Sequence, residues 1–188
     1  MIGKVTKSRI ALTALMLAWT VVVFASNDPQ RPCDQSTTGL LAQIINTSKS
    51  FCGTPYRYGG TSRSGIDCSG LMRTAFGEHN LELPHSSKRL RKMGVHVDFK
   101  ALEPGDLLFF KGRNINSKST GHVALVTSVC NGHVEMVHAT RRGVVVDQLE
   151  KQPYYSTRLL EARRVIDYHQ LEDLALLLES GIFHFPRM

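Results

Sequence analysis

Apolar residues recur at helical spacing in two segments of the first half of the chain. Within residues 38–51, leucine and isoleucine fall on one face of a helix. From Cys68, apolar residues follow at offsets of three, four, seven and eight, so a second amphipathic helix is predicted to begin at this cysteine. Asp67 directly precedes it and is a residue type that caps helix N-termini. A short basic helix is expected from Pro84 to Met93.

Short apolar runs separated by turn signals dominate the second half of the chain, and this is the pattern of β-strands. Asn131-Gly132 is a typical hairpin turn between two such runs. Helices followed by a series of antiparallel strands predict an α+β domain. Leucine and isoleucine at helical spacing predict one further helix within residues 167–182. Strands are predicted at residues 107–110, 122–129, 134–139, 144–146 and 160–166.

The N-terminus has the pattern of a secretory signal. Three basic residues precede the apolar run 10–24, and Val23-Phe24-Ala25 resembles a cleavage site. An uncleaved membrane anchor is the alternative, although the run is at the short limit for a span. We therefore expect an exported protein of the periplasm or cell envelope, which touches the membrane only if the signal stays attached. The predicted organisation is a signal peptide (1–25), a linker (26–37), a domain (38–166) and a helical extension (167–188).

The formal net charge of +7 narrows the choice of partner. A mildly basic surface suits an anionic partner such as a membrane or a cell-wall polymer. Nucleic acid is the rival partner, but the sequence has no basic helix combined with an aromatic platform, so none is predicted. Residues 88–92 are nonetheless strongly basic.

Four cysteines, Cys33, Cys52, Cys68 and Cys130, constrain both redox state and metal binding. Export places them in an oxidising compartment, where cysteines tend to pair. Cys33 and Cys52 flank the first predicted helix, so we expect any bridge to join them and Cys68 to stay free. No CxxC spacing is present, and neither a metal nor a cofactor is predicted.

Cys68 is the candidate nucleophile. A helix N-terminus favours negative charge, so the predicted position should lower the pKa of its thiol. A buried structural cysteine is the alternative. Among eight histidines, His122 opens one apolar strand and His138 lies inside the next. Either could be an ordinary core histidine, but two on paired strands, together with a helix-start cysteine, favour a catalytic triad.

An ordered series of motifs resembles the NlpC-type peptidases, papain-like cysteine enzymes of the bacterial cell wall. It is most similar to the small single-domain enzymes of Gram-negative bacteria. The motifs, in chain order, are Pro55-Tyr56-Arg57-Tyr58-Gly59-Gly60, Ile66-Asp67-Cys68-Ser69-Gly70-Leu71, Leu83-Pro84, Pro104-Gly105-Asp106-Leu107-Leu108-Phe109-Phe110, Gly121-His122-Val123-Ala124, Val137-His138-Ala139-Thr140 and Glu161-Ala162-Arg163-Arg164-Val165.

The resemblance implies a papain-like α+β fold in which helices pack on an antiparallel sheet. It implies Cys68 as nucleophile, His122 as general base and His138 as the group that orients His122. Tyr56 matches a tyrosine beside the thiol that helps to bind the oxyanion, with core packing as the alternative. Asp67 and Ser69 match positions near the substrate, although Asp67 can also be simply the helix cap.

The implied substrate is the stem peptide of peptidoglycan. We expect the protein to be a monomer. The D-alanine–diaminopimelate cross-link is slightly favoured over the D-glutamate–diaminopimelate bond. A catalytically inactive wall-binding module and an acyl-transfer enzyme are the alternatives. The family usually has an arginine after Pro84, where this chain has His85 and then the basic run, so substrate preference is open. The polar loop 112–120 before His122 can shape the cleft.

The turn between the two histidine strands constrains the triad. Side chains alternate between the faces of a strand, and cross-strand partners share a face. With a plain two-residue turn at Asn131-Gly132, His138 lies opposite Leu125, which sends His122 to the other face. A triad needs both imidazoles on one face.

We therefore expect a three-residue loop, Cys130-Asn131-Gly132, with a left-handed glycine. Val129 then pairs with His133, and His138 lies opposite Ala124. This register puts the two imidazoles on the same face as diagonal neighbours.

Overall fold

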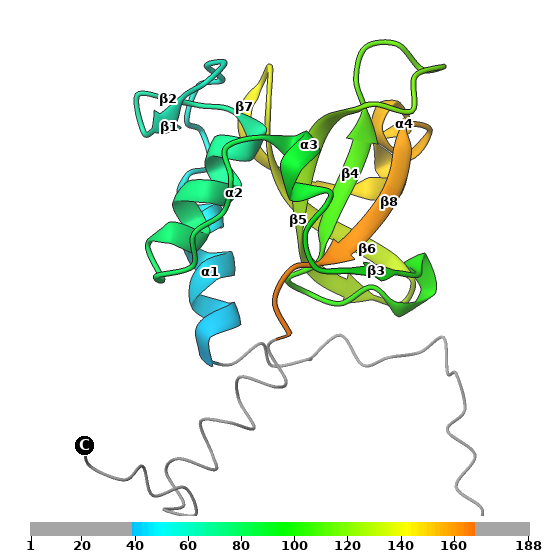
Figure 1. Cartoon of the computed structure of the whole chain (residues 1–188), viewed down its shortest axis with the longest axis horizontal. Helices are drawn as coiled ribbons and strands as arrows, with labels where there is room; N and C mark the ends of the chain where they lie inside the picture. Colours follow the sequence, from blue (N-terminus) through cyan, green and yellow to red (C-terminus); the bar gives the residue numbers. More distant parts are fainter. Residues whose placement is uncertain (1–38, 168–188) are drawn as a thin grey trace, which may run out of the picture.

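A computed structural model describes residues 39–167 of the 188-residue chain (Figure 1). The predicted signal peptide and linker, Cys33 and nearly all of the predicted C-terminal extension lie outside the described residues. The elements are α1 (Gly39–Ser50), β1 (Thr61–Ser62), β2 (Gly65–Ile66), α2 (Cys68–Gly77), α3 (Ser87–Leu90), β3 (Val95–Val97), η1 (Phe99–Ala101), β4 (Leu107–Lys111), β5 (Thr120–Cys130), β6 (His133–Thr140), β7 (Gly143–Gln148), η2 (Leu149–Lys151), α4 (Pro153–Ser156) and β8 (Leu159–Arg164).

A six-stranded antiparallel sheet forms the centre of the domain, in the order β3-β8-β4-β5-β6-β7. The α+β class and each of the five predicted strands are confirmed. The two helices predicted at residues 38–51 and from Cys68 are also confirmed. The predicted basic helix is shorter than expected, because α3 ends at Leu90 and the chain then turns at Gly94, which has a φ of 64°.

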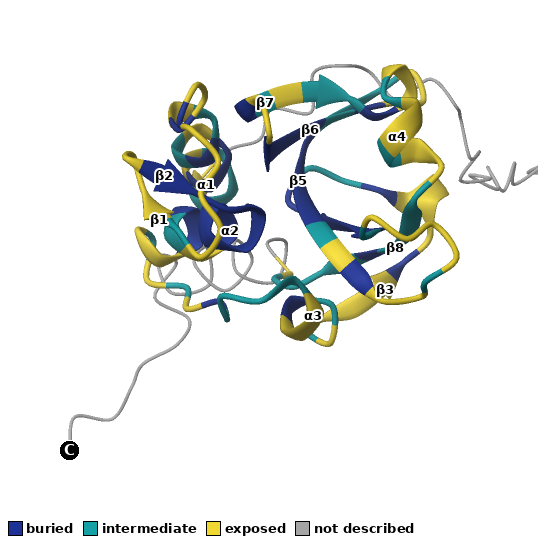
Figure 2. Ribbon diagram, turned by 90° about the horizontal axis from the view of Figure 1, so that it is seen from above, coloured by how far each residue is buried: buried dark blue, intermediate teal, exposed yellow. Residues whose placement is uncertain are grey.

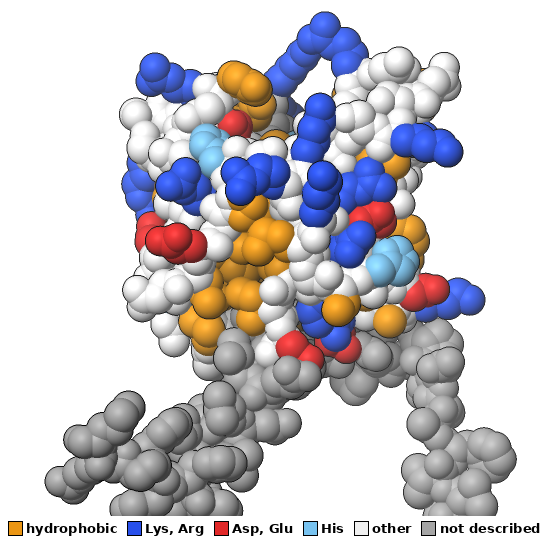
Figure 3. Space-filling model, viewed as in Figure 1, with side chains coloured by type: hydrophobic (Ala, Val, Ile, Leu, Met, Phe, Trp, Pro, Cys, Tyr) orange, Lys and Arg blue, Asp and Glu red, His pale blue; other side chains and the backbone are white. Residues whose placement is uncertain are grey.

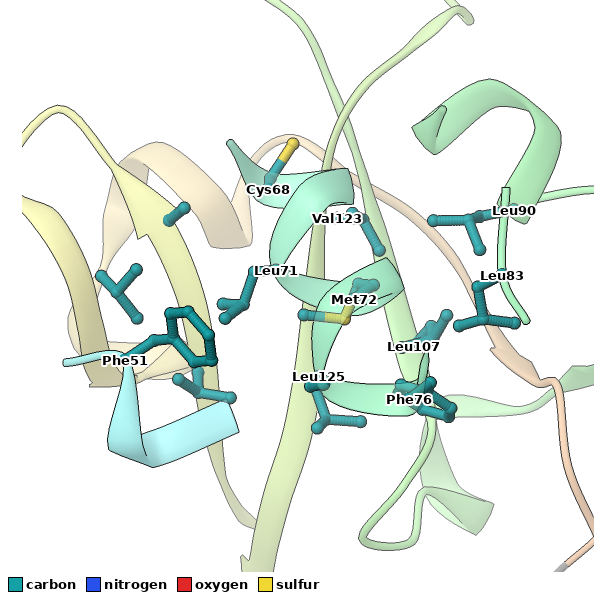
Figure 4. Packing of buried hydrophobic residues seen from close by; sticks show 14 of the residues in the cluster. Phe51, Cys68, Leu71, Met72, Phe76, Leu83, Leu90, Leu107, Val123 and Leu125 are labelled. Carbon is teal, nitrogen blue, oxygen red and sulfur yellow. The ribbon is translucent and has the colours of Figure 1, made fainter. Parts of the chain in front are cut away.

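Both faces of the sheet are covered by buried apolar clusters. Side chains alternate along each strand, so successive residues of a strand belong to different clusters. Val123 and Leu125 of β5 belong to a core with Leu71 and Phe76 of α2, shown in Figure 4. Ala124 lies between these two residues of β5 and belongs to a second core on the opposite face, together with Val126 and Leu149. Figure 2 shows the strands curving away from α1 and α2, with α4 at the far side.

The hairpin between β5 and β6 corrects the loop prediction. Cys130 pairs with His133 across a two-residue turn, and Asn131 and Gly132 both have positive φ, at 49° and 78°. The extra residue that brings His122 and His138 to the same face lies instead in a β-bulge around Thr127, since the register shifts between Val126 and Ser128.

Beyond the bulge, the pairing is the one the triad requires. Leu125 pairs with Val137, so the register predicted around the two histidines is confirmed although its structural cause was wrong. Glu135 holds the bulge in place: it accepts a hydrogen bond from Thr127 Oγ1 at 2.7 Å and one from Lys49 Nζ of α1 at 2.8 Å.

The cysteines also depart from expectation. Cys52 is an exposed free thiol, whereas Cys130, at the end of β5, is disulfide-bonded. A bridge between Cys33 and Cys52 is therefore wrong. Cys68 is free, as predicted, and it is also buried. Among residues 39–167, no helix combines the length and apolar character that a membrane span requires.

Candidate active site

The start of α2 is fixed by Asp67. Its Oδ1 accepts a hydrogen bond from the Gly70 N–H at 2.7 Å, which is the capping bond expected from sequence. Ser69 Oγ donates to the same oxygen at 3.0 Å, and His85 Nε2 lies 3.1 Å from it. The other carboxylate oxygen accepts from the Gly59 N–H at 2.8 Å. These bonds hold the first turn of α2 against two neighbouring loops.

The Asp67 carboxylate is ionised in this setting. Burial alone would raise its pKa, but the hydrogen bonds from Gly70, Gly59, His85 and Ser69 hold that pKa below its ordinary value. Asp67 therefore acts as helix cap, and the Ser69 hydroxyl is engaged with it in the free protein.

Cys68 occupies the first residue of α2, and Figure 4 shows its sulfur directed away from the hydrophobic side chains beneath it. The residue is only 7% exposed. Burial raises the pKa of the thiol to about 11, with a further contribution from the negative charge of Asp67. The backbone N–H groups of Val123 and Ser69 point at the sulfur and lower the pKa only in part.

The expectation of a lowered thiol pKa is thus wrong, because the loss of solvation outweighs the helix terminus. In the free protein the sulfur carries its proton. The bond from Val123 also locates the thiol next to His122, the preceding residue of β5.

His122 and His138 are brought together as predicted. His122 Nε2 lies 2.9 Å from His138 Nδ1, and the rings meet edge to face with centroids 5.2 Å apart. His138 is fully buried. Burial, and then the neighbouring His138, lower the pKa of His122 to about 3. Both imidazoles are neutral near pH 7, since burial also lowers the pKa of His138.

Asp147 of β7 is the main residue that the sequence analysis missed. Its Oδ2 lies 3.0 Å from His138 Nε2, and Arg142 Nη2 donates to the same oxygen. Gln152 Nε2 donates to Oδ1 at 3.2 Å. Met136 pairs with Asp147, which makes Asp147 a diagonal neighbour of His138 on the same face. The predicted strand stopped one residue short of it, so the alternation was not followed far enough.

The chain of contacts fixes the proton positions on both rings. A carboxylate only accepts, so His138 Nε2 donates its hydrogen to Asp147. The neutral His138 Nδ1 is then an acceptor, and His122 Nε2 donates to it. His122 Nδ1 then carries no hydrogen, and its lone pair is available to accept a proton.

Tyr155, from the short helix α4, packs over the histidine pair. Its ring centroid lies 5.2 Å from that of His122 and 4.7 Å from that of His138. Burial raises the pKa of its hydroxyl to about 12, so Tyr155 is neutral where it packs against the two imidazoles. No motif in the sequence marked this residue, because its role depends on a turn between η2 and β8.

Tyr56 lies at the edge of the site and is 41% exposed. A bridge to Ile66 ties its backbone to the residue that precedes Asp67. Burial, and then the proximity of Cys68 and Asp67, raise the pKa of its hydroxyl, which therefore keeps its hydrogen. Among residues 39–167, no cluster of three or more histidine, cysteine, aspartate or glutamate side chains is arranged to hold a metal ion.

A buried helix-start thiol, with a histidine pair on the adjacent sheet, is the arrangement of the papain-like cysteine peptidases. Residues 53–164 match the NlpC/P60 family. The chain belongs to this family.

Relatives and solved structures agree with this assignment. The chain is 33% identical over 158 residues to the probable endopeptidase NlpC of Escherichia coli (strain K12), covering 83% of this chain and 97% of that protein. It is 37% identical to the murein DD-endopeptidase MepS/murein LD-carboxypeptidase of the same strain, covering 68% of this chain and 64% of that protein. A crystal structure of an NlpC/P60 family protein from Bacillus cereus ATCC 10987 gives a TM-score of 0.61 at 35% identity, over 69% of this chain and 41% of the other.

Proposed function

We propose that the protein is a peptidoglycan hydrolase of the cell envelope, a cysteine endopeptidase with Cys68 as nucleophile. The observation that carries the proposal is the contact chain from Asp147 through His138 to His122, which ends at the backbone beside the Cys68 thiol. A purely structural cysteine needs no such chain. The names of the relatives, probable endopeptidase and murein DD-endopeptidase, support the same class of substrate.

The proposed reaction starts from neutral groups. His122 Nδ1 removes the thiol proton as the sulfur attacks an amide carbonyl, and the C–S bond forms while the carbonyl electrons move to oxygen. The backbone N–H groups at the start of α2, with the Tyr56 hydroxyl, stabilise that oxyanion. His122 then gives its proton to the leaving amine, and the C–N bond breaks. Water, deprotonated by His122, attacks the acyl-enzyme and restores the thiol.

The bond that we favour is the D-alanine–diaminopimelate cross-link between stems. The murein endopeptidase relative supports this choice. Another relative, at 37% identity, is named gamma-D-glutamyl-L-lysine dipeptidyl-peptidase, and this name keeps a bond after D-glutamate as the alternative.

Digestion of purified peptidoglycan tests the proposal. Mass spectrometry should find cross-linked dimers converted to monomers by the wild-type protein, and no conversion by Cys68→Ala. Intact dimers that bind the protein would instead indicate a wall-binding module, and new acyl linkages would indicate an acyl-transfer enzyme.

A further inference from the structure

A cavity of about 770 Å³ opens between α2, α3 and the loop that joins them. Three cations line it: Arg73 from α2, and Arg89 and Lys92 from α3 and the turn that follows. Glu82 is the only acid in this lining, so the cavity has an excess of positive charge.

These cations differ from others in the described part of the chain. Arg91 is bonded to Glu161 at 2.8 Å, and Arg164 to Asp106 at 2.9 Å. No hydrogen bond or ion pair within residues 39–167 engages the side chains of the three cavity cations. Arg89 and Lys92 line the same cavity, so their like charges repel each other. An anion in the cavity would remove that repulsion.

Apolar groups form the rest of the lining, from Leu83, Pro84 and Met93. Figure 3 shows hydrophobic side chains exposed on this face of the molecule, with lysine and arginine side chains above and beside them. A ligand suited to such a surface combines anionic groups with short aliphatic segments. The size lies within the range of small-ligand sites.

His85 connects the cavity to the nucleophile. It lines the cavity, and its Nε2 lies 3.1 Å from Oδ1 of Asp67, the residue before Cys68. An extended ligand whose reactive amide lies at Cys68 can therefore continue past His85 into the cavity.

We propose that this cavity binds the free carboxylates of the peptidoglycan stem peptide. The inference rests on the proposed function for the identity of the ligand. Stem peptides carry carboxylates on short aliphatic side chains, which matches both the cations and the apolar lining. A phosphate polymer is the competing anion, but nothing in it reacts at a thiol, whereas the connection through His85 leads to Cys68.

Calorimetric binding to the Cys68→Ala protein tests the proposal without turnover. Two probes are used: a stem tetrapeptide with free carboxylates, and the same peptide with those carboxylates amidated. The double variant Arg89→Gln/Lys92→Gln should bind the acidic peptide about tenfold more weakly, because charge-assisted hydrogen bonds are lost. Its affinity for the amidated peptide should not change. Lys100→Gln/Lys151→Gln removes two exposed charges elsewhere and serves as the control.

The proposal is overturned if the two double variants weaken binding equally, since that is a general effect of net charge. It is also overturned if the acidic and amidated peptides bind alike, or if neither binds. Because the assay needs no hydrolysis, charge-dependent binding by a protein that cuts no wall would leave the carboxylate site intact and reject the endopeptidase function alone.

Discussion

Two features of the Cys68 position act in opposite directions on the pKa of its thiol. The helix start offers N–H groups to the sulfur, but the residue is buried to 7% exposure, and burial raises the thiol pKa to about 11. With His122 also neutral, the resting site holds a thiol and an imidazole, not a thiolate–imidazolium pair.

The rate at which the Cys68 thiol is alkylated should depend on pH. A raised pKa means that the thiolate fraction grows with pH, by about tenfold per pH unit below the pKa. The rate of Cys68 alkylation by iodoacetamide should therefore keep rising up to about pH 11. Cys52 also reacts, so its rate is measured in Cys68→Ala and subtracted. A plateau below pH 7 would reveal an ion pair and contradict the neutral site.

Asp147 is a positioning residue in our account, because it acts on His122 only through His138. Asp147→Asn should lower kcat by about a hundredfold with little change in KM, since the amide can donate to His138 and reverse the proton positions. The pH profile of kcat should also move. Gln152→Ala, which removes only the weaker contact at Oδ1, is the matched control. An unchanged pH profile, with loss of stability alone, would leave Asp147 a purely structural role.

At the scale of elements, the β5–β6 hairpin shows what sequence patterns can and cannot supply. The requirement that His122 and His138 share a face fixed the register near them, and the structure has that register. The loop prediction failed because the extra residue can be accommodated anywhere along the strand, and it lies at Thr127, where Glu135 and Lys49 hold it. Contacts from a distant helix leave no local signal.

The same limit explains the rest of the site. Cys68, His122 and His138 stand in ordered motifs and were predictable. Asp147 and Tyr155 become partners of the histidines only through the pairing of β7 and the position of α4. The sign of the thiol pKa shift depended on burial, which a helix pattern does not report.

The geometry of the two-residue turn predicts that a methyl group added at Gly132 lowers the stability of the protein. Gly132 has a φ of 78°, and a Cβ there would meet no atom within 4 Å, so Gly132→Ala suffers only from backbone strain. We expect a loss of about 1 kcal/mol in the free energy of unfolding, measured in urea. Gly77→Ala is the control: it is equally open but lies at the end of α2 without a positive φ, and should be neutral or stabilising. Equal effects of the two changes would contradict the turn geometry.

At the scale of the whole molecule, the disulfide at Cys130 adds a covalent cross-link to the domain. Cys52 and Cys68 are free, so the remaining cysteine of the sequence, Cys33, is the expected partner. Peptide mapping by mass spectrometry without reduction should find a peptide with Cys33 linked to one with Cys130. A Cys52-containing linked peptide would contradict this. Because a disulfide restricts the unfolded chain, Cys130→Ser should lower stability by about 2–4 kcal/mol.

The burial of Cys68 also affects how readily its sulfur is oxidised. A disulfide at Cys130 implies surroundings that oxidise thiols, and a thiolate there is open to conversion to sulfenic and then sulfinic acid. Peroxides react with the thiolate, so a sulfur that keeps its proton is spared between encounters with substrate. We therefore expect the protonated sulfur of Cys68 to persist in surroundings that oxidise Cys130, and to become reactive only when His122, in its proposed role as base, takes the proton.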